Sequence, residues 1–224
     1  SGGSILGDRT RMAALTASEA AYVRPSPAGR HLGGVARATR ESMIVMESAG
    51  FDVVLVETVG VGQSEVAVAG MVDTFLLITL ARSGDQLQGI KRGILELADV
   101  ITVHKADGDH EGEARVAARE LSIAMKLISN DPAARRPPVL TSSSFTGTGL
   151  DEVWQAVLDH RSYLQEHGGL EPRRGRQQVE WLWSLVEGEV LDGLRNSAGV
   201  GALRAGIEAE VAANRLSALD GAER

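Results

Sequence analysis

Short apolar runs alternate with longer stretches of helical periodicity over the first three quarters of the chain. The runs are rich in β-branched residues or leucine and lack polar alternation, which is typical of parallel strands covered on both faces. Predicted strands are residues 53–56, 75–80, 100–103 and 139–141, and predicted helices are residues 35–49, 86–98, 111–128 and 150–164. This alternation predicts a doubly wound α/β fold with a mostly parallel sheet, whose ligands lie at the carboxyl ends of the strands.

The pattern changes after residue 164. Gly168, Gly169, Pro172 and a group of arginines indicate a linker. Two amphipathic helices are predicted beyond it, separated by Asn196 and Ser197. We therefore expect one domain over residues 1–166, and a linker with a C-terminal helical hairpin, or arm, over residues 167–224.

Charge and composition exclude several classes of protein. The formal net charge is −7 at pH 7, so the chain lacks the broad positive field that nucleic-acid-binding proteins use. The absence of cysteine excludes disulfides and thiolate metal sites. Because no apolar run approaches the ~18 residues of a membrane helix, we expect a cytoplasmic protein with no membrane or nucleic-acid partner.

A first candidate motif follows the strand predicted at residues 53–56. Glu57 stands at its end, and Gly60 comes three residues later. A carboxylate at this place can hold Mg²⁺ or its water, and a glycine N–H can reach the γ-phosphate of a nucleoside triphosphate. The alternative interpretation is a glycine-rich turn beside a solvated glutamate.

A second motif, His104-Lys105-Ala106-Asp107, follows the strand predicted at residues 100–103. GTPases carry Asn-Lys-x-Asp here, with the aspartate accepting two hydrogen bonds from guanine and the lysine stem lying along the base. This pattern favours GTP over ATP, although a polar turn is the alternative. His104 replaces the usual asparagine, and we expect His104→Asn to tighten GDP binding.

A third motif follows the last predicted strand. Ser143 and Ser144 stand where a guanine loop would contact the base, and a Gly-Thr-Gly turn at residues 147–149 then opens a helix. Serines before a helix are often only caps. The order of the three motifs, each after a strand, is more specific than any one of them.

Several longer segments resemble one family closely. Residues 1–12, 24–27, 32–35, 57–65 and 84–93 are similar to the MeaB/ArgK/MMAA family, the GTPase chaperones of coenzyme-B12-dependent acyl-CoA mutases. The resemblance runs nearly end to end. It implies a P-loop GTPase of the G3E type, with a partial G domain over residues 1–166 that protects or loads a methylmalonyl-CoA mutase or a relative.

The resemblance also implies roles for individual residues. Asp8 and Glu57 would hold Mg²⁺, Gly60 would meet the γ-phosphate, and Gln63 or Glu57 would orient the attacking water. Asp107 would read the guanine of GTP or GDP, with Lys105 beside it and Ser143 and Ser144 closing the base pocket. Asp85 and Lys91 belong to a switch loop that would touch the mutase, and the helical arm implies a homodimer.

One family feature is missing from the printed sequence. No G-x-x-x-x-G-K-[ST] phosphate-binding loop occurs in the 224 residues. We therefore expect the chain to be truncated at its amino terminus and, by itself, inactive and weak in nucleotide binding. Alternatives are a metal-inserting GTPase, an ArgK-type kinase or ATPase of an amino-acid transport system, or a partner-binding module.

Overall fold

The computed structural model describes residues 12–25, 32–58, 64–81, 92–128 and 135–223. The chain forms two compact units, Ser1–Gln177 and Gln178–Arg224. The first unit contains the sheet and the helices that pack on it.

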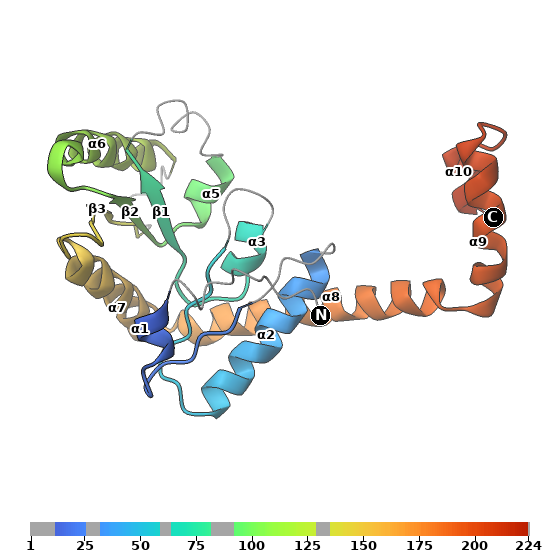
Figure 1. Ribbon diagram of the computed structural model, residues 1–224, viewed down its shortest axis with the longest axis horizontal. Coiled ribbons are helices and arrows are strands. Elements are labelled where there is room, and N and C mark those ends of the chain that lie inside the picture. Colours follow the sequence, from blue (N-terminus) through green and yellow to red (C-terminus); the bar gives the residue numbers. More distant parts are fainter. Residues whose placement is uncertain (1–11, 26–31, 59–63, 82–91, 129–134, 224) are drawn as a thin grey trace. The chain divides into compact units, whose positions relative to one another are not determined.

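The sheet confirms the predicted α/β fold (Figure 1). Three parallel strands lie in the order β1-β2-β3, where β1 is Leu76–Leu80, β2 is Val100–His104 and β3 is Val139–Thr141. The central strand is the most buried, because helices cover both of its faces: Val100, Ile101 and Val103 have no exposed surface. The carboxyl ends of all three strands therefore point to one edge of the sheet.

Helices α6 (Glu111–Ile128) and α7 (Leu150–Glu166) lie on opposite sides of the sheet (Figure 1). The buried positions of α6 recur at steps of three and four residues, so one face of the helix meets the strands. Around them lie α1 (Ala13–Thr16), α2 (Leu32–Ser48), α3 (Ser64–Ala69), α5 (Arg92–Leu97) and the 3-10 turn η2 (Gly108–His110).

The predicted strand at residues 53–56 is wrong. In the structure this segment forms neither strand nor helix, and Leu55 is 84% exposed. A strand is stabilised by its hydrogen-bonded neighbours, and within the described residues no strand pairs with this segment. The helix predicted at residues 86–98 is described only from Arg92 onward, where it forms α5.

The segment predicted as a linker is helical from Leu170 onward. Helix α8 (Leu170–Arg195) runs through the segment that the glycines, Pro172 and the arginines mark as irregular. Only the turn at Gly168 and Gly169 interrupts the chain after α7. Pro172 lies in the first turn of α8, where the missing N–H removes no helical hydrogen bond. The division of the chain at residue 166 remains a prediction about domains, whereas the compact units divide after Gln177.

The last unit contains the end of α8, then α9 (Ala198–Ala212) and α10 (Ala218–Glu223). Ser197 caps α9, because its Oγ accepts a hydrogen bond from the Val200 N–H. The predicted hairpin of α8 and α9 is not formed, since α9 packs against α10 instead. Gly221 of α10 lies beside Ile207 and Val211 of α9. In the parts of the chain that the structure describes, no helix is both long and apolar enough to cross a membrane.

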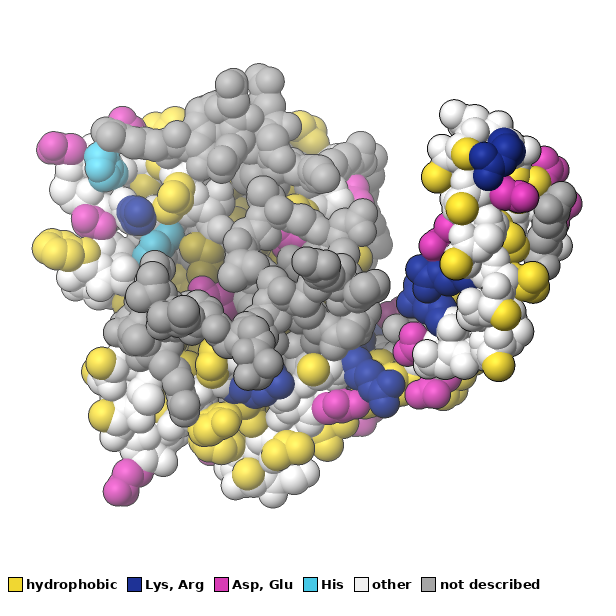
Figure 2. Space-filling view, turned by 45° about the vertical axis from the view of Figure 1, so that its right-hand side comes forward, with side chains coloured by type: hydrophobic (Ala, Val, Ile, Leu, Met, Phe, Trp, Pro, Cys, Tyr) yellow, Lys and Arg dark blue, Asp and Glu magenta, His cyan; other side chains and the backbone are white. Residues whose placement is uncertain are grey.

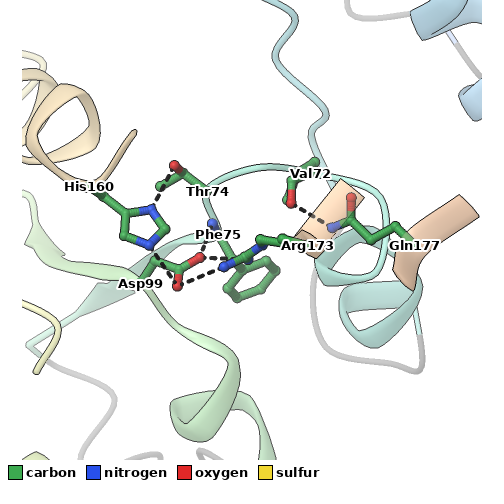
Figure 3. Close-up of polar contacts among 7 residues, drawn as sticks. All are labelled: Val72, Thr74, Phe75, Asp99, His160, Arg173 and Gln177. Atoms are coloured by element: carbon green, nitrogen blue, oxygen red, sulfur yellow. Dashed lines mark hydrogen bonds and ion pairs between the residues drawn. The ribbon is translucent and has the colours of Figure 1, made fainter. Parts of the chain in front are cut away.

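A buried polar network joins four elements at the amino ends of the strands (Figure 3). The Asp99 carboxylate accepts hydrogen bonds from the Phe75 N–H at 2.8 Å and from Arg173 at 2.9 and 3.3 Å. His160 Nε2 lies 3.3 Å from Asp99 Oδ1, and its Nδ1 lies 2.9 Å from Thr74 Oγ1. A neutral imidazole fits both contacts, donating to Asp99 and accepting from Thr74.

Three further contacts fix the start of α8 on the first unit. Arg174 Nε donates to Asp73 Oδ1 at 2.8 Å, and this hydrogen bond lowers the pKa of Asp73. The Gln177 amide donates to the Val72 carbonyl at 2.9 Å, and Arg40 of α2 donates to the Gln177 carbonyl at 3.0 Å. The first two turns of α8 are therefore part of the sheet-containing unit.

We predict that Arg173→Ala lowers the free energy of unfolding by about 2 kcal/mol, because it leaves the largely buried Asp99 carboxylate without its cationic partner. Arg176→Ala is the matched control, since Arg176 is an exposed side chain on the same helix and should change stability by less than about 0.5 kcal/mol. Urea unfolding followed by circular dichroism measures both. Equal midpoints for the two variants would contradict the assigned role of Arg173.

A second prediction concerns pH. Burial lowers the pKa of His160 in the folded protein, although the Asp99 carboxylate acts in the opposite direction. As the pH falls through about 6.5, the unfolded chain binds a proton at His160 before the folded protein does, so stability is lost. The slope of unfolding free energy against pH between 7.5 and 5.5 should be shallower in His160→Gln and unchanged in His167→Gln, whose side chain is exposed. Parallel curves for wild type and His160→Gln would refute this.

Candidate functional site

The predicted site residues divide into two groups. Asp8, Gly60, Gln63, Asp85 and Lys91 lie outside the described residues. The structure describes Glu57, Lys105, Asp107, Ser143 and Ser144. Of these five, the last four lie in two loops that meet at the carboxyl edge of the sheet.

The loop after β2 and the loop after β3 are joined through their backbones. The Ser142 N–H donates to the Val103 carbonyl at 3.0 Å, and the Ala106 N–H donates to the Ser142 carbonyl at 3.0 Å. These bonds continue the parallel pairing of β2 and β3 beyond the end of the sheet. We refer to residues 142–148 as the serine loop.

Lys105 adopts a left-handed backbone conformation with φ of 57°. For a residue with a Cβ this conformation costs about 1–2 kcal/mol, and such strain is concentrated at functional sites. The turn at Lys105 brings the Ala106 N–H to the serine loop, while the lysine side chain itself stays exposed.

Ser143 connects the serine loop to Asp107. Its side chain is completely buried, and its Oγ donates to Asp107 Oδ1 at 2.6 Å. The same oxygen accepts hydrogen bonds from the N–H groups of Phe145 at 3.1 Å and Thr146 at 3.3 Å. Because both acceptor positions are used, the hydroxyl proton must point to Asp107. Among the described residues, Asp107 Oδ2 accepts no hydrogen bond.

His104 makes a second connection between the two loops. Its Nδ1 lies 2.9 Å from Ser142 Oγ, and its Nε2 lies 3.1 Å from Ser144 Oγ. Ser142 Oγ is also 2.8 Å from Thr102 Oγ1 inside the sheet. In the sequence, His104 is predicted only as a replacement for the usual asparagine, and Ser142 and Thr102 are not among the predicted site residues. The available signal was a threonine within an otherwise apolar buried strand.

The predicted Gly-Thr-Gly turn closes the serine loop and begins α7. The Ser143 N–H donates to the Thr148 carbonyl at 2.9 Å, and the Gly147 N–H donates to the Ser143 carbonyl at 3.0 Å. Gly149 has φ of 76°, and a Cβ there would lie 2.1 Å from the Thr141 carbonyl oxygen. Only glycine fits this approach. Gly149, not a serine, is the N-cap of α7, so the alternative that the serines only cap this helix is excluded.

The metal part of the site is described only at Glu57. This glutamate is exposed at the end of the unpaired segment that follows α2. Its carboxylate oxygens are ligands of the type Mg²⁺ prefers, but its predicted partner Asp8 is not described. Among the described residues, no three His, Asp or Glu side chains are grouped closely enough to hold a metal ion.

The described half of the site can therefore recognise a planar polar group. A carboxylate oxygen of Asp107, the exposed Lys105 side chain and the backbone of the serine loop lie on one edge of the sheet, and the loop hydrogen bonds fix the carboxylate. Such an arrangement suits a heterocycle that presents N–H donors to a carboxylate.

The chain is similar to known proteins over most of its length. The family model described as Methylmalonyl Co-A mutase-associated GTPase MeaB matches residues 1–198. A probable GTPase of Mycobacterium tuberculosis is 58% identical over 216 residues, which are 96% of this chain and 64% of that protein. The GTPase ArgK of Escherichia coli K12 is 47% identical over 193 residues, which are 86% of this chain and 58% of that protein.

The fold has a match among solved structures as well. The crystal structure of a LAO/AO transport system kinase superposes with a TM-score of 0.71 at 38% identity, covering 93% of this chain and 66% of that one. The chain thus spans less than two thirds of the length of either curated bacterial relative.

Proposed function

The chain belongs to the MeaB family of methylmalonyl-CoA mutase-associated GTPases, and we propose that the whole protein binds guanine nucleotides, hydrolyses GTP and acts as a chaperone of a B12-dependent acyl-CoA mutase. The 224 residues contain no phosphate-binding loop, so by themselves they would bind nucleotide weakly and would not hydrolyse it. The 2.6 Å hydrogen bond from Ser143 to Asp107 carries the nucleotide part of this proposal. It joins the two loops that the sequence predicts for base recognition and holds one carboxylate oxygen, while the other accepts no hydrogen bond from the described residues.

Guanine suits this carboxylate because its N1–H and exocyclic amine are neighbouring donors. The adenine edge offers an acceptor where guanine offers the N1–H, so Asp107 would be left with an unfavourable contact. Lys105 would cover the base with its apolar stem, and the backbone of Ser143 and Ser144 would meet the guanine oxygen. These contacts support GTP and GDP as ligands over ATP and ADP.

Hydrolysis would depend on residues carried over from the family resemblance. Mg²⁺ would be held by Asp8 and Glu57, and when bound it would neutralise charge that develops on the phosphates. Gly60 would donate its N–H toward the γ-phosphate, and Gln63 or Glu57 would orient the attacking water. Release of inorganic phosphate into water distinguishes this reaction from that of an ArgK-type kinase, which would leave phosphate on a protein partner.

The proposed partners are a methylmalonyl-CoA mutase-like enzyme and a second copy of the chain. The family description supports the mutase, and the loop that contains Asp85 and Lys91 is the proposed contact. The arm supports the second copy, because apolar side chains on one face of α8 are exposed. Figure 2 shows hydrophobic side chains among charged ones on the surface of the arm. These residues are Val179, Leu182, Trp183, Val186, Val190 and Leu194. Water-exposed stripes of this kind usually mark interaction surfaces.

We predict that Asp107→Asn changes nucleotide preference from guanine toward xanthine. The amide offers one acceptor instead of two and can donate to the xanthine 2-oxygen, so the XDP-to-GDP affinity ratio should rise about 100-fold or more. Calorimetry at nucleotide concentrations up to the millimolar range measures the ratio, which does not depend on how tightly the phosphates are held.

Asp109→Asn is the control for that experiment. It makes the same change of charge two residues away, at an exposed position in η2, and should leave the ratio unchanged. Equal affinity of the wild type for GDP and ADP would refute guanine recognition by this site.

We also predict that Val190→Glu weakens self-association at least tenfold, since it places a charge in the middle of the proposed apolar interface. Val190 is 64% exposed in the single chain, so the variant should fold normally. Ser184→Glu, an exposed position on a different side of α8, is the control. Sedimentation equilibrium gives the dissociation constants of both variants. A wild type that stays monomeric at 0.1 mM, which is about 100-fold above a micromolar dissociation constant, would exclude the dimer.

A further inference from the structure

The hydroxyls and the imidazole at the end of β2 form one continuous hydrogen-bonded chain. It runs from Thr102 to Ser142, then through the His104 ring to Ser144, with distances of 2.8, 2.9 and 3.1 Å. The chain begins at a buried threonine in the sheet and ends at an exposed serine in the serine loop. It connects the rigid part of the fold with the loop that the base would contact.

Every donor and acceptor needed for this hydrogen-bonded chain is present. A neutral imidazole has one donor and one acceptor, on opposite edges of the ring, and each hydroxyl has one proton to donate. If the Thr102 hydroxyl donates to Ser142, then Ser142 donates to His104 Nδ1 and His104 Nε2 donates to Ser144. The reverse direction satisfies the same atoms equally well. Linked hydrogen bonds of this kind strengthen one another in a buried setting.

We propose that His104 is a positioning residue that ties the serine loop to β2 through both ring nitrogens and thereby sets guanine affinity. The effect on nucleotide rests on the proposed function. Ser144 is adjacent to Ser143, which holds Asp107 Oδ1. The two contacts of His104 therefore fix the distance between the Asp107 carboxylate and the backbone of the serine loop, which are the two groups that a bound base would contact together. A site that is already ordered binds with a smaller loss of entropy.

This role explains why an imidazole is useful at position 104. The side-chain amide of asparagine ends near the position of Nδ1, and that of glutamine reaches the position of Nε2. Neither amide can contact Ser142 and Ser144 together. His104→Asn should therefore loosen the serine loop and weaken GDP binding, which reverses the expectation drawn from the usual motif.

The test compares His104→Ala, His104→Asn and His104→Gln with the wild type. Amide hydrogen exchange at Ser143, Phe145 and Thr146, followed by NMR without nucleotide, reports the order of the serine loop. Exchange should rise about tenfold or more in the alanine variant and less in the two amide variants. GDP affinity measured by calorimetry should fall in the same order. His110→Ala, a ring on the neighbouring η2 turn, should leave both quantities unchanged.

A double-mutant cycle separates tethering from a general effect on folding. Ser144→Ala should raise exchange in the wild type and in His104→Gln, which keeps the contact to Ser144. It should have no further effect in His104→Asn, which has already lost that contact. Additive effects in both backgrounds, or exchange in His104→Ala equal to that of the wild type, would overturn the proposal.

The nucleotide measurement distinguishes two failures. If the wild type binds GDP and His104→Ala binds it equally well, His104 does not set affinity and the inference is wrong. If the wild type binds no guanine nucleotide, the proposed function is wrong. In that case the exchange series decides the tether by itself, because it uses no ligand.

Discussion

The carboxylate of Asp99 is the contact on which the packing of the sheet-containing unit depends. It stands immediately before β2, accepts the N–H of Phe75 immediately before β1, and meets His160 of α7 and Arg173 of α8. A carboxylate this far removed from water requires a cation and several donors. Four elements must therefore come together at one point, and their relative positions are fixed by the charge that they surround.

Strand β2 connects the Asp99 contacts at its amino end with the loops at the opposite edge of the sheet. It is the central strand, fully buried over Val100, Ile101 and Val103, so its two ends cannot move independently. The proposed base-recognition loops begin where β2 and β3 end, and the left-handed turn at Lys105 is supported by the backbone hydrogen bond from Ala106 to Ser142. A strained backbone conformation persists only where the surrounding structure holds it in place. At Lys105 the end of the buried strand β2 supplies these surroundings.

The sequence predicted those parts of the structure that depend on local pattern. The apolar run at residues 100–103 and the periodicity of residues 111–128 identified β2 and α6. A buried face requires apolar residues at fixed spacing, and this spacing can be read from the sequence. The segment at residues 53–56 has a similar apolar composition but pairs with no described strand. Residue composition does not determine whether a partner strand lies beside a segment. The arginines after Gly169 suggested a linker because their acidic partners, Asp73 and Asp99, lie 74 to 101 residues away in sequence.

A similar limit applies to the site. Lys105, Asp107 and Ser143 could be proposed from motif order, whereas the contacts of His104 depend on how two loops align after separate strands. Small residues make that alignment possible: serine hydroxyls replace longer side chains, and Gly149 lets α7 approach Thr141. The Ser143 hydroxyl makes its one donated and two accepted hydrogen bonds within the protein. It therefore needs no hydrogen bond from a nucleotide. The proposed base-recognition half of the site is thus ordered by hydrogen bonds within the protein itself, so a nucleotide would not lose affinity by ordering these loops.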